Sequence, residues 1–90
     1  MSTVAAMRER LAALQPEALD IADDSARHAG HAGARSGGGH YRLSIVSAKF
    51  AGQTTLARHR LVHEALGEMM KREIHALSIV AKTPNECSSG

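Results

Sequence analysis

Residues 40–80, HYRLSIVSAKFAGQTTLARHRLVHEALGEMMKREIHALSIV, switch twice between two hydrophobic periods, and these switches decide the fold. In residues 40–47 every second side chain is apolar or aromatic, which predicts a β-strand. Residues 55–70 carry apolar side chains at helical spacing, and Gly67 could divide this helix in two. Residues 74–80 predict another strand. A strand, a helix and a strand in this order form a right-handed crossover, in which the two strands are parallel.

The chain before this unit predicts one more helix and one more strand. A helix is expected over residues 3–14, where apolar side chains recur at helical spacing. Ser2 or Thr3 can cap its start, and Pro16 ends it. Residues 18–23 alternate and predict a short strand, antiparallel to the next one. The order α-β-β-α-α-β gives an α/β (α+β) architecture, with helices covering one face of a three-stranded mixed sheet.

The chain between Asp24 and Gly39 has no periodicity and holds five of the eight glycines, which predicts a long flexible loop. With 90 residues the protein is too short for two hydrophobic cores. Residues 1–84 are therefore expected to form one domain. Residues 85–90 are expected to be a disordered tail, whose last residues could be a cloning remnant.

Composition excludes several classes of protein. No apolar run approaches the roughly 20 residues of a membrane-spanning helix. The N-terminus lacks the basic region and the long apolar region of a signal peptide. The single cysteine, Cys87, cannot form an intrachain disulfide, which fits a reducing compartment. We therefore expect a cytoplasmic protein that does not bind membranes and is a monomer in isolation.

Positive charge is concentrated in the middle of the chain. Residues 25–72 hold eight Lys or Arg against two Glu, whereas the stretches before and after them are net negative. A polyanion or an acidic partner would meet this middle segment.

Six histidines stand against one Tyr, one Phe and no Trp. His28 and His31 lie in the glycine-rich loop, where they are either solvated or able to swing onto a metal. His75 alternates with Leu77 and Ile79 on a predicted strand. It is either a structural edge residue or the rigid half of a metal site that faces the loop. Two ligands do not close a tetrahedral site, so a second protein would have to complete it.

The other three histidines have weaker metal-binding patterns. His40 begins the strand at 40–47 and is interpreted as a polar strand-edge residue rather than a third loop ligand. His59 and His63 are one helical turn apart, but His59 projects to the edge of the apolar face and is interpreted as packed and hydrogen-bonded. Arg60 between them excludes the His-Glu-x-x-His metalloprotease motif.

Several short motifs occur together in a fixed order. They are Asp23-Asp24-Ser25, Gly39-His40-Tyr41, Phe50-Ala51-Gly52, Arg58-His59-Arg60 and Ile74-His75-Ala76-Leu77. This set resembles the BolA family, in which a Phe-x-Gly turn leads into an Arg-His-Arg helix and a Val/Ile-His-Ala-Leu strand closes the domain. The resemblance covers about residues 4–84. One departure is Gln53, where many members carry Lys or Arg.

The resemblance implies a class II KH-like fold and a partnership with a monothiol glutaredoxin of the Cys-Gly-Phe-Ser type. In such complexes the two proteins share a [2Fe–2S] cluster. Glutaredoxin and glutathione give thiolates, and the BolA protein gives histidine. By this resemblance His75 is the fixed ligand, His28 or His31 is the loop ligand, and the isolated protein carries no cluster. The implied function is an iron–sulfur adaptor in cluster trafficking or in iron and redox regulation.

The alternative is a DNA-binding transcriptional regulator, which members of this family have also been proposed to be. The helix at 55–70 would then be a recognition helix. The residues expected to contact the partner or nucleic acid are Arg58, Arg60, His63, Lys71 and Arg72. Against this function, residues 50–70 contain no Gly-x-x-Gly loop, and aromatic side chains for base stacking are scarce. An enzyme is not expected, because no Ser-His-acid arrangement or phosphate loop is present.

Overall fold

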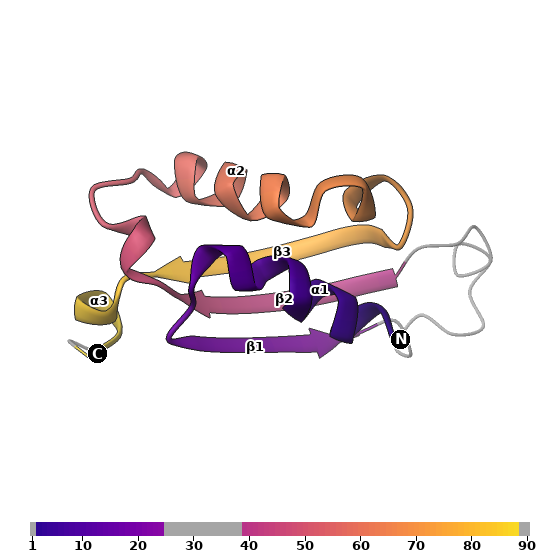
Figure 1. Cartoon of the computed structure of the whole chain (residues 1–90), viewed down its shortest axis with the longest axis horizontal. Coiled ribbons are helices and arrows are strands. Elements are labelled where there is room, and N and C mark those ends of the chain that lie inside the picture. Colours follow the sequence, from indigo (N-terminus) through magenta and orange to yellow (C-terminus); the bar gives the residue numbers. More distant parts are fainter. Residues whose placement is uncertain (1, 25–38, 89–90) are drawn as a thin grey trace.

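Three strands form a mixed sheet in the computed structural model, which describes residues 2–24 and 39–88 (Figure 1). They are β1 (Ala18–Asp23), β2 (Gly39–Val46) and β3 (Ile74–Lys82), in that spatial order. β1 and β2 are antiparallel, whereas β2 and β3 are parallel. Both pairings confirm the predicted α/β topology.

Helices cover one face of this sheet (Figure 1). They are α1 (Thr3–Leu11), followed by the 3-10 turn η1 (Ala12–Leu14), and α2 (Thr55–Leu66), which is preceded by η4 (Ala48–Phe50) and followed by η5 (Gly67–Lys71). None of the helices in the described ranges is long and apolar enough to cross a membrane.

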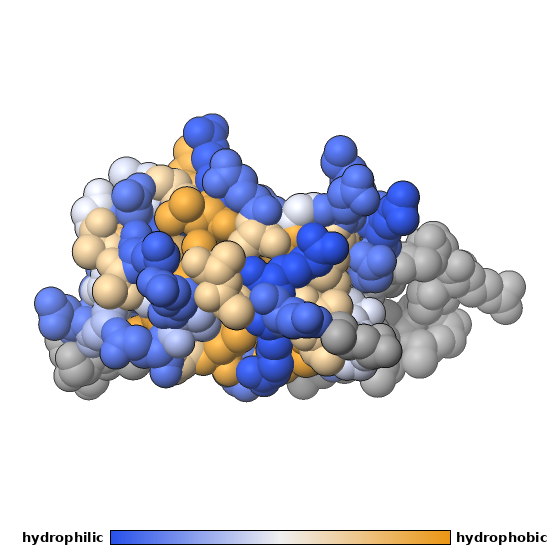
Figure 2. Space-filling view, in the orientation of Figure 1, coloured by the Kyte–Doolittle hydropathy of each residue, from blue (hydrophilic) through white to orange (hydrophobic). Residues whose placement is uncertain are grey.

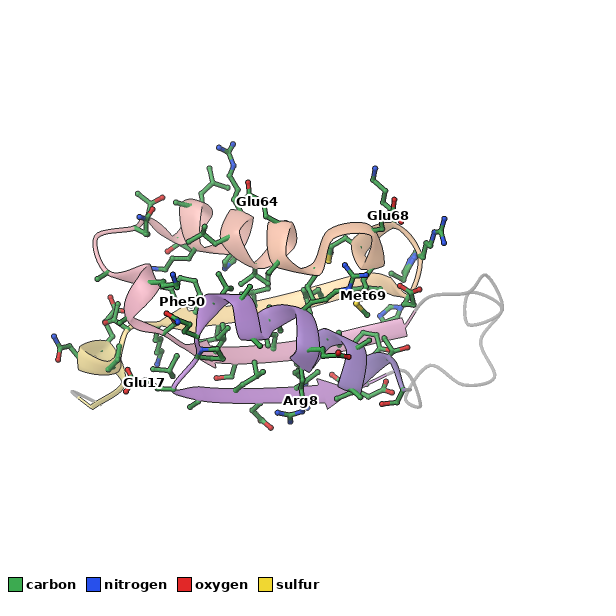
Figure 3. The ribbon with its side chains drawn as sticks, viewed as in Figure 1. Arg8, Glu17, Phe50, Glu64, Glu68 and Met69 are labelled. Carbon is green, nitrogen blue, oxygen red and sulfur yellow. The ribbon has the colours of Figure 1, made fainter. Side chains whose placement is uncertain are left out.

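The core lies between the helices and the sheet. Its buried members are Met7, Leu11, Leu14, Ile21, Tyr41, Leu43, Ile45, Phe50, Val62, Leu66, Met69 and Ile74. In β2 the side chains alternate as predicted, so that Leu43 and Ile45 are buried while Arg42 and Ser44 are exposed. The labelled side chains of Phe50 and Met69 point into this layer, whereas Glu64 and Glu68 point away from it (Figure 3). The opposite face of the sheet carries mostly small and polar side chains, together with Val80, which is 49% exposed.

The helix boundaries follow local chemistry. Ser2 Oγ accepts a hydrogen bond from the Ala5 backbone N–H at 3.1 Å, which caps α1. Thr54 caps α2 in the same way. Gly67 ends α2 with φ of +58°, a left-handed value that favours glycine. The expected division of the helix at Gly67 is thus confirmed.

Residues 85–88 of the expected disordered tail, 85–90, belong to a short helix, α3 (Pro84–Ser88). The expectation is wrong for these residues because Thr83 and Glu86 form a capping box. The Glu86 N–H donates to Thr83 Oγ1 at 3.3 Å, and the Thr83 N–H donates to Glu86 Oε1 at 2.9 Å. Pro84 occupies the first helical position, where no N–H is needed.

Candidate metal centre

β2 and β3 run parallel, so their first residues meet at one corner of the sheet, at the right-hand end in Figure 1. Backbone hydrogen bonds fix this corner. The Gly39 N–H donates to the Glu73 carbonyl at 2.7 Å, and the Asp24 N–H donates to the His40 carbonyl at 2.8 Å. The corner therefore holds the start of two strands and the residue that follows β1.

A bulge at this corner changes the direction of His75. Gly39 pairs with Ile74 and His40 pairs with Ala76, so His75 is an extra residue in β3. The expected alternation of His75 with Leu77 is wrong for this reason, since a bulge moves a side chain out of the regular pattern. Ile74 is 2% exposed, whereas His75 is exposed to solvent. The bulge thus keeps an imidazole out of the core.

His40 and His75 lie side by side, with ring centroids 5.4 Å apart and ring planes tilted by 38°. Two imidazoles on one tetrahedral metal, with bonds of about 2.0–2.1 Å, place their ring centres roughly 5 Å apart. The separation of the two rings is compatible with two imidazoles on one metal and equally with an ordinary contact between rings. From the sequence alone His40 is interpreted as a strand-edge residue, because periodicity within a strand gives no information on the register between two strands.

An open hollow of about 290 Å³ adjoins this pair on the uncovered face of the sheet. Its lining includes His40, Arg42, Asp24 and Ser78. Arg42 Nε donates to Asp24 Oδ2 at 2.6 Å, so the two charges neutralise each other at the edge of the hollow. The Arg42 side chain is 59% exposed, and such a pair adds little stability.

His28 and His31, the predicted loop ligands, lie outside the described residues. The described residues on either side of their segment, Asp24 and Gly39, are both hydrogen-bonded at the corner of His75. Within residues 2–24 and 39–88 no group of three or more His, Cys, Asp or Glu side chains is placed to hold a metal ion. A metal bound by His40 and His75 would therefore need further ligands from elsewhere.

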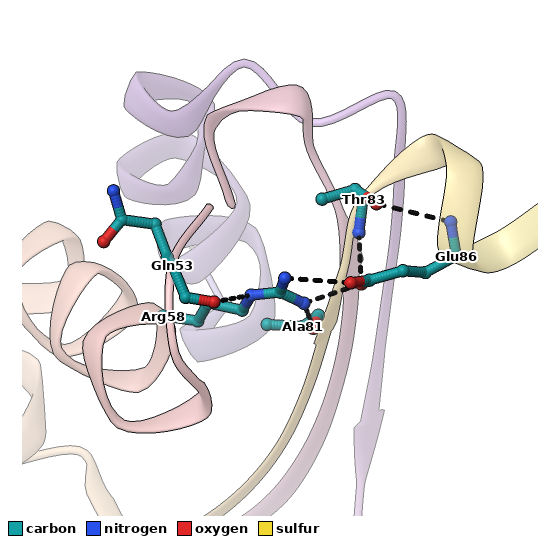
Figure 4. Close-up of polar contacts among 5 residues, drawn as sticks. All are labelled: Gln53, Arg58, Ala81, Thr83 and Glu86. Atoms are coloured by element: carbon teal, nitrogen blue, oxygen red, sulfur yellow. Dashed lines mark hydrogen bonds and ion pairs between the residues drawn. The ribbon is translucent and has the colours of Figure 1, made fainter. Parts of the chain in front are cut away.

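Arg58, a predicted contact for a partner or nucleic acid, is occupied by internal hydrogen bonds (Figure 4). Its guanidinium donates to Glu86 at 2.6 and 2.9 Å, to the Gln53 carbonyl at 2.9 Å and to the Ala81 carbonyl at 3.0 Å. Only 13% of the Arg58 side chain is exposed. The structure thus favours a structural role for Arg58.

The other predicted contact residues take no part in the hydrogen bonds of Arg58. Arg60 and His63 are exposed on α2, and Lys71 and Arg72 are exposed at the end of η5 and just after it. In Figure 2 hydrophilic side chains project from the upper outline at two places, over α2 and over η5, with apolar and pale residues between them. His59 is half-buried on α2, which agrees with a packed role, while its hydrogen bond stays a prediction.

Glu86 provides a pH-dependent contribution to stability. Hydrogen bonds from Arg58 and from the Thr83 N–H lower the pKa of Glu86 from 4.5 to about 2. A carboxyl with a lowered folded-state pKa stabilises the fold above its unfolded pKa and loses this effect as pH falls. We expect Glu86→Gln to lower the urea midpoint at neutral pH, with the difference from wild type shrinking between pH 4.5 and about 2.

Glu64→Gln is the matched control for this prediction, because Glu64 points away from the sheet and makes no ion pair within the described ranges (Figure 3). It should leave the neutral-pH midpoint nearly unchanged. Circular dichroism across a urea series at each pH gives the measurement. A difference between wild type and Glu86→Gln that stays constant down to pH 2 would contradict the assigned contact.

Fold and site together define a small α/β domain that places an exposed imidazole, His75, beside a half-buried one, His40, at one corner of its sheet. The model of the BolA-like protein family matches residues 11–86. The chain therefore belongs to the BolA-like family, as the sequence motifs predict. The solved structure of BolA1 from Arabidopsis thaliana has a TM-score of 0.82 and 43% identity, with 96% of each chain covered.

Curated relatives support the same assignment. BolA-like protein 1 of Mus musculus is 48% identical over 89% of this chain, which spans 57% of that relative. SufE-like protein 1 of Arabidopsis thaliana, named chloroplastic/mitochondrial, is 45% identical over 89% of this chain, which spans 23% of its length. The DNA-binding transcriptional regulator BolA of Escherichia coli is 36% identical over 89% of this chain and 78% of its own. Membership of the family does not determine the compartment, so the cytoplasmic expectation stays untested.

Proposed function

We propose that this chain is an iron–sulfur adaptor that binds a monothiol glutaredoxin and shares a [2Fe–2S] cluster with it as cargo. His75 is the ligand held on β3, and His28 or His31 supplies the second imidazole. Thiolates come from the glutaredoxin cysteine and from glutathione. The observation that carries this proposal is the exposure of His75 by a bulge, at the corner to which Asp24 and Gly39 are bonded.

The donor chemistry favours a shared cluster over a closed metal site. Neutral imidazole suits iron, but the described part of the chain offers only two imidazoles together. Imidazole in place of thiolate removes negative charge from the cluster and raises its reduction potential, as Rieske centres show. A partner that brings thiolates would complete the site. Dissociation of the neutral histidines from iron would then allow the cluster to be transferred to another protein.

His40 supports this site from its position beside His75. The two residues lie on paired strands, so their rings stay close to each other. The His40 ring therefore restricts rotation of the His75 side chain. It is also the rival to His28 and His31 as second ligand. Single alanine variants at these three positions separate the two roles, since a ligand changes the electronic spectrum of the cluster and a neighbour changes only its lifetime.

The function is tested by adding the chain without cluster to a cluster-loaded monothiol glutaredoxin homodimer in the presence of glutathione. We expect the all-thiolate visible circular dichroism spectrum to convert into a new spectrum that saturates at equal amounts of the two proteins. A glutaredoxin with its active-site cysteine replaced by serine is the control and should yield no cluster. An unchanged spectrum, with no co-elution of the two proteins, would contradict the proposal.

A DNA-binding regulator is the second candidate, and the name of the Escherichia coli relative is its main support. Exposed Arg60, Lys71 and Arg72 could contact phosphates. The candidate is weaker because Arg58 is already hydrogen-bonded within the protein, and because the acidic Glu68 lies on the same 3-10 turn as Lys71. We therefore place the adaptor function first.

A further inference from the structure

β3 is an edge strand that carries an unusually uncharged stretch. The sheet of the described residues ends at β3. Residues 76–81, Ala-Leu-Ser-Ile-Val-Ala, contain no charge, glycine or proline, and Val80 is 49% exposed. A long, apolar edge of this kind is a template for pairing with another strand, and proteins commonly block such edges.

The directions of two backbone carbonyls show where the edge is blocked. The Ser47 N–H donates to the Lys82 carbonyl at 2.9 Å, so this carbonyl faces the β2 side. Successive carbonyls along a strand point in opposite directions, and the Ala81 carbonyl therefore points to the free edge. Arg58 Nη1 donates to this carbonyl at 3.0 Å. The arginine occupies the acceptor that an incoming strand would use.

Glu86 holds this arginine in place. Its two carboxylate oxygens accept from Arg58 at 2.6 and 2.9 Å, a bidentate pairing that fixes the plane of the guanidinium. Glu86 is in turn fixed by its capping box with Thr83 (Figure 4). We call Arg58, Glu86 and Thr83 the edge guard. It joins α2 and α3 at the C-terminal end of β3.

The edge of β3 that lies N-terminal to the edge guard can pair with the same edge of a second copy of the chain. Two identical edges can pair antiparallel about a two-fold axis, which gives a closed dimer. The same alternation that turns the Ala81 backbone outward also turns that of Leu77 and Ile79 outward. An alignment centred on Ser78 pairs Leu77 of one copy with Ile79 of the other. It also brings the Lys82 end of each copy within one residue of the acidic Glu73 of the other.

We propose that the free edge of β3 is a surface for pairing with a second copy of this chain, and that the edge guard keeps it closed. In the alignment centred on Ser78, Ala81 of each copy would lie opposite the bulged His75 of the other. Arg58 bound at Ala81 therefore blocks both ends of the paired edge at once. This inference does not rest on the proposed cluster binding, but the paired edge includes the position of His75, the proposed cluster ligand.

The proposal is tested by opening the guard in the full chain. Arg58→Ala should retain its far-ultraviolet circular dichroism spectrum and form a dimer. Light scattering after gel filtration over a concentration series should show a dimer dissociation constant lowered by roughly tenfold or more relative to wild type. Glu86→Gln should shift it in the same direction by less. Arg60→Ala, which removes an exposed arginine from the same helix, is the matched control and should behave as wild type.

A second variant identifies the contact. Arg58→Ala combined with Ser78→Lys should return to the monomer, because the alignment places the two lysines opposite each other. In the Arg58→Ala dimer, the Leu77 and Ile79 amides should exchange with deuterium more slowly than in the wild-type monomer. A folded Arg58→Ala or Glu86→Gln that stays as monomeric as wild type would overturn the proposal. So would a dimer that Ser78→Lys fails to dissociate.

Discussion

His75→Ala is expected to remove the histidine-ligated cluster from the complex with a monothiol glutaredoxin. The variant loses the proposed ligand that the bulge exposes on β3. Alanine has no nitrogen that could bind the iron in its place. Iron and sulfide should then return to the all-thiolate glutaredoxin homodimer. The visible circular dichroism spectrum of the mixture should match that of the homodimer alone, with cluster content in the heterocomplex reduced by about tenfold or more.

The matched control is His63→Ala, which removes an exposed imidazole from α2 and should leave the spectrum as in wild type. Far-ultraviolet circular dichroism checks that both variants fold. His28→Ala and His31→Ala extend the series to the predicted loop ligands, and His40→Ala extends it to the neighbour of His75. If His75→Ala kept the wild-type spectrum at the wild-type yield, His75 would not be a ligand.

Phe50→Ala is expected to cause the largest loss of stability of any single truncation in the core. Phe50 is the only phenylalanine, is fully buried at 0% exposure and connects β2 to α2 through the η4 turn. Truncating a buried phenylalanine to alanine costs about 3–5 kcal/mol, since both the apolar contacts and the filled volume are lost. Against a total of about 5–15 kcal/mol, this would leave a marginal domain.

Urea unfolding followed by circular dichroism measures this loss. Leu56→Ala is the matched control, because Leu56 is 63% exposed and its truncation should change the free energy of unfolding by less than about 0.5 kcal/mol. Phe50→Leu should fall between the two, because leucine fills part of the volume. If Phe50→Ala lowered the free energy of unfolding no more than Leu56→Ala, the packing of Phe50 would not stabilise the core.

Local patterns in the sequence predict most of the fold. β1 has the predicted bounds, Ala18–Asp23, because a period of two within six residues is a local property. Gly67 ends α2 as expected, because the positive φ at this position favours glycine, and glycine can be identified in the sequence. The capping box of α3 is also local, and the spacing of Thr83 and Glu86 could have revealed it.

The candidate site is less predictable because it depends on contacts between strands. The sequence indicates that His75 starts a strand, but the bulge that exposes it arises from the pairing of Gly39 with Ile74 and of His40 with Ala76. The same register brings His40 to His75. Arg58 is the opposite case, because the sequence predicts a contact with a partner where the structure shows an internal ion pair. Its charge predicts a surface contact, but its partner Glu86 lies 28 residues away in a segment expected to be disordered.

The central claim is that a histidine nitrogen of this chain binds the iron of a shared cluster. Pulsed electron paramagnetic resonance on the reduced cluster measures this directly, with only the histidines of this chain labelled with ¹⁵N. We predict ¹⁵N couplings of directly bound imidazole in the complex with the glutaredoxin, and their loss in His75→Ala. A reduced cluster in the wild-type complex without any such ¹⁵N coupling would contradict the account.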